Sequence, residues 1–301
     1  MELGQTISKI RQNKNVTIKE LCGDRLSRSA YTRFVNGETE TSIQNFLHML
    51  DILNVSFHEI MFLYPVESNQ YYNHCMAKIS KYTAENDIAG LKSLQKECAL
   101  FSKHSKDKYY HLSLICQARI SRLQENTINQ SIIDYFMNYL NSVETWMHYE
   151  IILFNATLFI YSPDYLDAVM NRLLDSLKQY ENYLPHLKYM LRLLQNLFNV
   201  HLFNKDIPRL NKIFKILSSI HISNDFMNYK LNFTFYKGCF LLAVHNNQTG
   251  HDIIEKCIET ADFLELDVFS AAFRNSYQRL CKLYNLENKT FNTKEHPSCQ
   301  F

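Results

Sequence analysis

Between residues 16 and 60, apolar side chains recur every three or four positions, which is the spacing expected on the inner faces of short helices. Ser27 is a favourable N-cap, and Gly37, ten residues later, is a favourable helix end. The short helix between them carries Arg28 and Arg33 on its polar side. The pattern therefore predicts a compact group of helices that presents a short basic helix. Its apolar positions are Leu21, Leu26, Tyr31, Phe34, Phe46, Leu50, Leu53, Val55 and Ile60.

A second pattern, a run of amphipathic helices, extends from about residue 69 to residue 286. Two helices per step of roughly 34–45 residues are typical of a tetratricopeptide-like solenoid, and an irregular helical bundle is the alternative. We therefore predict an all-α protein. Polar breaks place helix starts at Asp87, Asn129, Asp164, Asp206 and Thr249, in steps of 42, 35, 42 and 43 residues.

Pro65 lies between the two patterns, so we place a domain boundary there. The expected parts are a helical domain over residues 1–65, a repeat domain over 66–286 and a tail over 287–301. The tail lacks helical periodicity, and we expect it to be disordered.

The first helix of each repeat pair is expected to line the inner surface of the solenoid. Asn155, Asn196 and Asn232 interrupt apolar runs in three of these helices. An amide both donates and accepts, so the three could clamp the backbone of an extended peptide; a surface position or an interhelical hydrogen bond is the alternative for each. Arg192, one turn before Asn196, could pair with a peptide carboxylate. Aromatic residues expected to line apolar pockets beside them are Tyr149, Phe154, Phe159, Tyr189, Phe235 and Tyr236. The first helices are expected at 69–84, 106–124, 144–161, 184–203, 226–245 and 267–285.

Composition excludes several functional classes. The six glycines never lie closer than twelve positions, which removes the dinucleotide fingerprint and the P-loop. The eight cysteines form no CxxC pair and are expected to be reduced and mostly buried, while the twelve histidines show no metal-ligand spacing and are expected on the surface. We therefore expect no enzyme activity, no cofactor and no metal. The charged N-terminus and a longest apolar stretch of eleven residues, 151–161, predict a cytoplasmic protein without a membrane segment.

Charge is unevenly distributed over the N-terminal domain. Residues 1–33 hold seven Lys and Arg against three acidic residues, whereas residues 34–64 hold no Lys or Arg and four acidic residues. Phosphate binding needs a basic face rather than a basic total, so this polarity favours DNA binding. A solvated surface is the alternative interpretation.

The N-terminal segment resembles the Xre-type helix-turn-helix of bacterial and phage repressors. The matching residues are Thr17, Glu20, Leu21, Ser27, Arg28, Ser29, Thr32, Arg33, Phe34, Gly37, Ser42, Leu53, Asn54, Val55 and Ser56. Ile18 departs from the family, which usually has a glutamine that contacts the DNA backbone. The resemblance implies a five-helix DNA-binding domain. Its expected DNA contacts are Lys19, Ser27, Arg28, Ser29, Thr32, Arg33 and Asn36.

The chain as a whole resembles the Rgg group of peptide-responsive regulators. The resemblance rests on SRSAYTRFVNGETE at 27–40, WMHYEIILFNATLFIY at 146–161, KYMLRLLQNLF at 188–198 and IEKCIETADFLELDVFSAAF at 254–273. It implies a cytoplasmic homodimer that binds promoter DNA and a short signalling peptide in quorum sensing, with a possible role in recruiting RNA polymerase. The expected peptide-binding residues are Tyr149, Asn155, Tyr189, Arg192, Asn196, Asn232 and Tyr236.

The terminal repeat pair, residues 249–285, is the expected dimer interface, because an open solenoid end has to be shielded. Its apolar residues are Ile253, Ile254, Ile258, Phe263, Leu264 and Phe269. Two other functions fit the sequence: a repeat protein that sequesters a protein partner, and a regulator gated by a small molecule.

Overall fold

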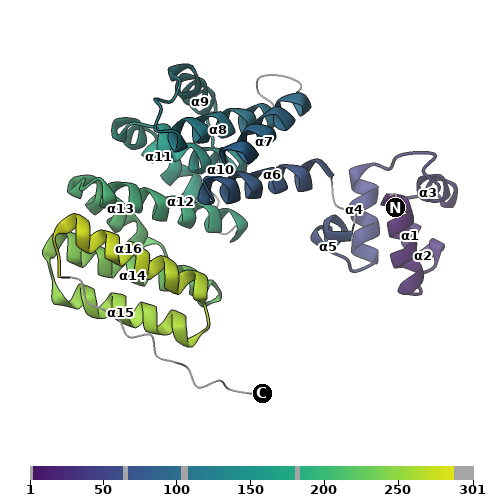
Figure 1. Cartoon of the computed structure of the whole chain (residues 1–301). Helices are drawn as coiled ribbons and strands as arrows, with labels where there is room; N and C mark the ends of the chain where they lie inside the picture. The colour runs from purple at the N-terminus through teal and green to yellow at the C-terminus, as the bar shows by residue number, and fades with distance from the viewer. Residues whose placement is uncertain (1–2, 64–66, 103–107, 180–183, 288–301) are drawn as a thin grey trace. The chain divides into compact units, whose positions relative to one another are not determined.

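The computed structural model describes residues 3–63, 67–102, 108–179 and 184–287, and every regular element among them is helical. The chain divides into two compact units, residues 1–128 and 129–301 (Figure 1). The all-α prediction is confirmed. The expected boundary at Pro65 and the expected tail beyond residue 287 lie outside the described residues.

The first part of unit one holds the five expected short helices within residues 3–63. Thr17 begins α2 with a capping box to Glu20, and the side chains of Ser27 and Ser42 cap α3 and α4. The helices enclose one core, centred on Ile7, Leu21, Tyr31, Phe34, Phe46, Met49, Leu50, Leu53 and Ile60. The helices are α1 (Leu3–Asn13), α2 (Ile18–Cys22), α3 (Arg28–Val35), α4 (Ile43–Ile52) and α5 (Phe57–Leu63).

The rest of unit one is a group of three longer helices, α6 (Glu67–Ala84), α7 (Ile88–Phe101) and α8 (Lys108–Leu123). Each contacts the other two, and Asp87 caps α7 at the predicted start. Cys75, Cys98 and Cys116, one from each helix, are fully buried.

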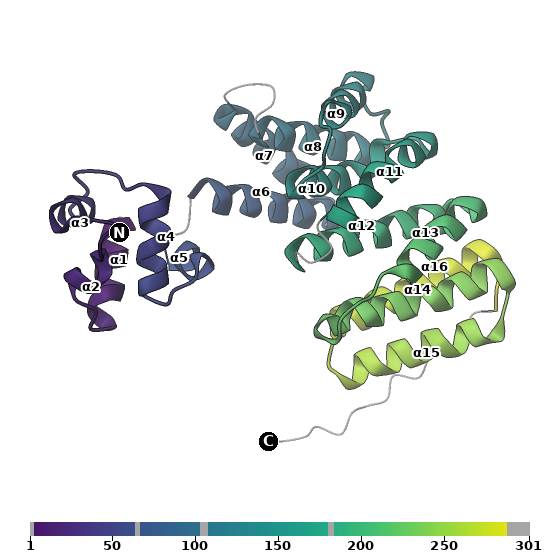
Figure 2. The same ribbon diagram turned by 180° about the vertical axis from the view of Figure 1, so that it is seen from behind.

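Unit two consists of helix pairs, seen from opposite sides in Figures 1 and 2. The first helices of successive pairs contact one another, α10 with α12, α12 with α14 and α14 with α16. We call these four the first-helix row, and α9, α11, α13 and α15 the second-helix row. The helices are α9 (Gln130–Ser142), α10 (His148–Thr157), α11 (Pro163–Gln179), α12 (Leu184–Phe203), α13 (Ile207–Ser219), α14 (Met227–His245), α15 (Gln248–Phe263) and α16 (Asp267–Tyr284), with 3-10 turns η1 (Leu158–Ile160) and η2 (Asn224–Phe226).

The expectation that the histidines lie on the surface is corrected. Three of the histidines expected on the surface, His111, His201 and His251, are buried among packed helices. The cysteines were expected to be mostly buried, and the seven in the described residues are free and buried.

No single helix in the described residues is long and apolar enough to cross a membrane. Only α4 and α5 taken together reach that length and apolar character, and they are bent by 99° relative to each other.

Candidate functional site

The candidate DNA-reading element is α3, and its orientation follows from its sequence. The Ser27 hydroxyl accepts a hydrogen bond from the Ala30 amide (3.2 Å), which fixes the first turn. Tyr31 and Phe34 point into the core. The opposite side of the helix is therefore exposed. It carries the predicted residues Arg28, Ser29, Thr32 and Arg33.

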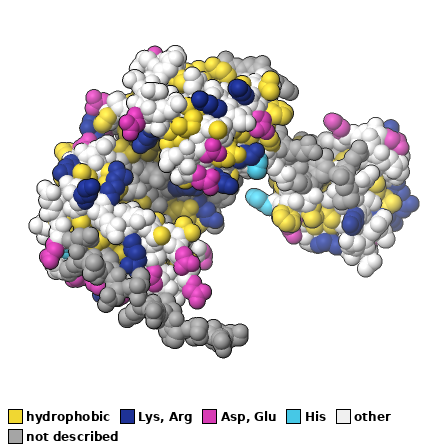
Figure 3. All heavy atoms as spheres, in the orientation of Figure 1, with side chains coloured by type: hydrophobic (Ala, Val, Ile, Leu, Met, Phe, Trp, Pro, Cys, Tyr) yellow, Lys and Arg dark blue, Asp and Glu magenta, His cyan; other side chains and the backbone are white. Residues whose placement is uncertain are grey.

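The other predicted DNA contacts are also exposed. Lys19 lies on α2, and Asn36 lies at the end of α3, where its amide donates to the Glu38 carboxylate (3.0 Å). Neither Lys19, Arg28 nor Arg33 forms an ion pair with any described residue. Figure 3 shows basic side chains on the surface over α1 to α3. These cations are thus available for phosphate or base edges.

Two residues that hold α3 in place were not identified from the sequence. Arg11, counted there only as part of the basic face, donates to the Tyr31 hydroxyl (3.1 Å) and to the Val16 carbonyl (2.7 Å). Gly4 allows α1 to approach α3 closely, because a Cβ at this position would lie 2.2 Å from the Phe34 carbonyl oxygen. The hydrogen bond from Arg11 to Tyr31 and the close approach at Gly4 both hold α3 in position against α1.

In unit two, the predicted amides Asn155 and Asn196 meet. The Asn196 side-chain NH₂ on α12 donates to the Asn155 side-chain oxygen on α10, at 2.8 Å. Both side chains are half-buried. One donor group on Asn155 and one acceptor on Asn196 have no other hydrogen bond with a described residue, so the pair retains capacity for a ligand.

A second amide contact joins α12 to α14. The Asn199 side chain donates to the Tyr236 hydroxyl at 3.0 Å. Burial raises the pKa of Tyr236 to about 12, although the hydrogen bond from Asn199 lowers it. Asn199 was missed from the sequence, whereas Tyr236 was predicted. Asn232 is half-buried one turn before Tyr236 on α14.

The remaining predicted peptide contacts surround these amides. Tyr189 packs edge-on against His148 at the start of α10, with ring centroids 4.2 Å apart. Tyr149, the next residue, is half-buried, and Arg192 is exposed. Burial raises the pKa of Tyr229, and the charge of Arg192 offsets part of that rise, which places Arg192 near α14.

Two buried polar atoms without a hydrogen-bond partner among the described residues lie in the same region. They are Nδ1 of His148 and Nε2 of Gln195, and burial lowers the pKa of His148. Gln195 is only 6% exposed and lies between Arg192 and Asn199 on α12. The sequence analysis did not identify it.

Two expected pocket aromatics belong instead to the core. Phe154 is 0% and Phe235 1% exposed. Phe154 stacks on Tyr161, and Phe235 stacks on Phe273 at 4.2 Å. The prediction that they line an open pocket was wrong, because both point between packed helices.

The expected dimer surface also changes. Ile254 and Ile258 are buried inside their own repeat and cannot contact a second chain. Exposed apolar side chains gather at the turn between α15 and α16. They are Phe263 (74% exposed), Leu264 (42%) and Val268 (81%).

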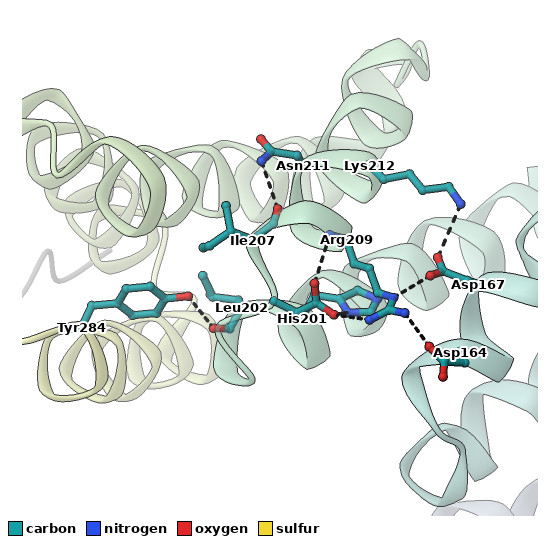
Figure 4. A network of polar contacts seen from close by, with 10 residues as sticks. Asp164, Asp167, His201, Leu202, Ile207, Arg209, Asn211, Lys212 and Tyr284 are labelled. Carbon is teal, nitrogen blue, oxygen red and sulfur yellow. Dashed lines mark hydrogen bonds and ion pairs between the residues drawn. The ribbon is translucent and has the colours of Figure 1, made fainter.

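A charged network connects two helices of the second-helix row (Figure 4). Arg209 on α13 forms ion pairs with Asp164 (2.7 Å) and Asp167 (2.5 Å) of α11 and with Asp206 (2.8 Å). His201 lies 3.7 Å from Asp206. Burial raises the pKa of Asp206, but hydrogen bonds from Arg209 outweigh it and leave the pKa lowered. The described residues contain no cluster of His, Cys, Asp or Glu that could hold a metal ion.

Comparison with solved structures shows the same fold elsewhere. A putative transcriptional regulator from Listeria monocytogenes EGD-e gives a TM-score of 0.83 over 95% of this chain and 99% of its own, at 19% identity. The SHP pheromone receptor Rgg2 of Streptococcus dysgalactiae gives 0.73 over 92% and 99%, at 21% identity. PrgX in complex with iCF10 gives 0.71 over 95% and 98%, at 13% identity.

The family itself follows from a sequence-family match. The C-terminal domain of the HTH-type transcriptional regulator Rgg matches residues 92–275, more than half of the 301 residues. The match spans α12, which carries Asn196, and the helices on either side of it. The chain therefore belongs to the Rgg family of helix-turn-helix transcriptional regulators.

Proposed function

We propose that this chain binds promoter DNA through α3 and a short, extended peptide through its first-helix row, and that the peptide alters promoter recognition. The observation that carries the peptide part is the amide row Asn155, Asn196 and Asn199, which bridges three helices. An extended peptide brings unpaired N–H and C=O groups that need partners once water is displaced. Amide side chains satisfy them with little demand on peptide sequence.

The relatives support this assignment. PrgX has been solved in complex with iCF10 and with cCF10, and Rgg2 is a pheromone receptor. Their fold covers more than nine-tenths of this chain. A peptide is therefore a better-supported ligand than a small molecule.

The DNA part is tested by selecting binding sites from random duplexes and measuring affinity for the selected site. Arg28→Ala and Arg33→Ala should each weaken specific binding by about 1–3 kcal/mol, the range for one good base contact. Mobility shifts at a fixed, stated salt concentration measure this. Asp51→Ala is the control, since it lies on α4 and not on α3. Unchanged affinity in both arginine variants would remove α3 as the reading helix and favour the partner-sequestering alternative.

The peptide part is tested by fluorescence polarisation with labelled pools of random, mostly apolar octapeptides. Wild type should bind at least one pool. Asn155→Ala and Asn196→Ala should each weaken that binding by about 1–3 kcal/mol, the range for leaving a buried polar group unpaired. Thr234→Ala on the exposed side of α14 is the control. If both asparagine variants bind as wild type does, the peptide surface lies elsewhere.

We also propose a homodimer, because helix-turn-helix proteins commonly read paired half-sites. The apolar corner of Phe263, Leu264 and Val268 is the proposed contact. Three neighbouring apolar side chains with this much exposure form a surface patch of the kind that marks protein–protein contacts.

A further inference from the structure

Charge is sorted between the two helix rows of unit two. The first-helix row carries seven Lys and Arg but only two acidic residues, Glu150 and Asp267. The second-helix row carries six Lys and Arg against eight acidic residues. The helices that a ligand against the first-helix row would contact therefore carry few acidic residues.

The acidic residue on α10, the helix that carries Asn155, already has hydrogen-bond partners. Glu150 is buried, accepts a hydrogen bond from the Met147 amide (3.0 Å) and accepts another from the Tyr139 hydroxyl (3.2 Å). It caps α10 and is not available to neutralise a neighbouring cation. Asp267 is the first residue of α16.

A stripe of four polar residues, followed by Phe203, runs along one face of α12. Lys188, Arg192, Asn196, Asn199 and Phe203 follow at spacings of four, four, three and four residues, which keeps them in line on a helix. Asn196 reaches α10 on one side and Asn199 reaches α14 on the other. Arg192 lies between these two directions on the helix and is exposed, so its guanidinium is on the side that neither neighbouring helix covers.

Cations lie at both ends of this stripe. Lys188 lies at its first end, with Nζ 5.3 Å from the Phe226 ring centre. At the other end Arg279 of α16 stacks over the Phe203 ring at 4.0 Å. Neither Lys188, Arg192 nor Arg279 forms an ion pair with a described residue, whereas Arg209 and Arg274 in the same unit do.

A second observation points to a missing ligand beside Arg192. The side-chain NH₂ of Gln195, more than nine-tenths buried, has no acceptor among the described residues. Gln195 is three residues after Arg192 and four before Asn199, so it borders the same stripe. Buried donors are normally paired, and a carboxylate oxygen is an acceptor that would suit both this amide and the neighbouring guanidinium.

From Lys188 to Asn199 the stripe spans eleven residues, about 16 Å of helix. An extended peptide advances roughly 3.3 Å per residue, so about five residues cover this length. Amides at one end can hold its backbone while the cations at the other end hold a charge.

We infer that the peptide is acidic, and that Arg192 and Lys188 bind a carboxylate of it next to the amide row. The inference rests on the proposed peptide-binding function and names the charge of the ligand. The carboxylate belongs either to an Asp or Glu side chain or to the peptide's C-terminus.

The test uses matched pools of labelled octapeptides with the same apolar residues and one fixed position, Asp, Asn or Lys, each as free acid and as C-terminal amide. If a side chain supplies the carboxylate, wild type should bind Asp pools at least tenfold more tightly than Lys pools, as free acid and as amide, and less so as salt is raised. If the C-terminus supplies it, amidation should instead weaken the binding of every pool at least tenfold.

Arg192→Glu should reverse the preference toward Lys pools, and Lys188→Glu should reduce it. Lys237→Glu is the matched control, since Lys237 is exposed on α14 about 100° around the helix from Tyr236. Equal binding of all pools, free acids and amides alike, that is lost in Asn155→Ala would overturn the acidic preference but leave peptide binding intact. If no pool binds wild type, the proposed function fails and this inference fails with it.

Discussion

Replacing Gly4 by alanine should weaken DNA binding without unfolding the protein, because Gly4 sets the distance between α1 and α3. The new Cβ would lie 2.2 Å from the Phe34 carbonyl oxygen and 2.9 Å from the Val35 Cα. Ordinary contact begins at 3.4 Å, so the two helices must separate by about 1.2 Å. The opposing atoms belong to the backbone, and no side-chain rotation can relieve the clash.

The expected loss of stability combines two opposing effects. Overpacking a close contact costs about 1–3 kcal/mol, and alanine returns at most about 1 kcal/mol through its higher helix propensity. A net loss of roughly 0–3 kcal/mol follows, which leaves a domain of ordinary stability folded. DNA binding should lose more, because a 1.2 Å shift of α3 exceeds the roughly 0.5 Å range of good hydrogen-bond distances. We expect at least a tenfold loss of affinity.

Urea unfolding followed by circular dichroism gives the stability, and fluorescence anisotropy with the selected duplex at fixed salt gives the DNA affinity. Ser8→Ala, on the same helix at a half-exposed position, is the control and should change neither. If Gly4→Ala is as stable as wild type and binds DNA equally well, then α1 and α3 do not pack as closely as described, and Gly4 does not position α3.

Three further predictions concern unit two. A double-mutant cycle on Asn155→Ala and Asn196→Ala should give a coupling of about 0.5–1.5 kcal/mol in urea unfolding, since the two side chains share one hydrogen bond, and additive losses would contradict that bond. Burial lowers the pKa of His201 in the folded state, so the unfolded chain takes up a proton first as the pH drops below about 6.5, and the free energy of unfolding should fall. His201→Gln should flatten that fall in urea titrations between pH 5 and 7.5. An unchanged slope would count against this role of His201. Phe263→Asp should shift light scattering from dimer toward monomer, and a monomeric wild type at micromolar concentration would reject the dimer.

The helices could be predicted from the sequence because their ends depend on residues only a few positions away. Ser27 is the predicted N-cap of α3, and Asp87, Asn129 and Asp206 cap helices at the predicted starts. The helices predicted to start at Asp164 and Thr249 begin one residue earlier, at Pro163 and Gln248. Capping acts over three residues, so it needs no knowledge of the fold. The Rgg membership was likewise readable, since motifs in both parts of the chain carry it.

Contacts across the fold could not be read in the same way. Asn199 and Tyr236 are 37 residues apart, and Arg11 and Tyr31 are 20 apart, so only packing brings them together. Helices α10 and α14 carry apolar and polar residues on all sides, which removes the periodicity that would identify their exposed faces. For that reason Phe154 and Phe235 were placed in a pocket although they lie in the core.

The contacts of Arg209 have a consequence for how unit two unfolds. In a linear array of repeats each unit interacts only with its neighbours, so the strength of each junction decides whether the array melts as one block or in pieces. Arg209 joins the second helix of one pair to the second helix of the next through two carboxylates of α11, Asp164 and Asp167. The junction between α11 and α13 is therefore a place where ion pairs add to the coupling between neighbouring repeat pairs. Without these ion pairs, that coupling would rest mainly on the contacts that α12 makes with α10 and α11.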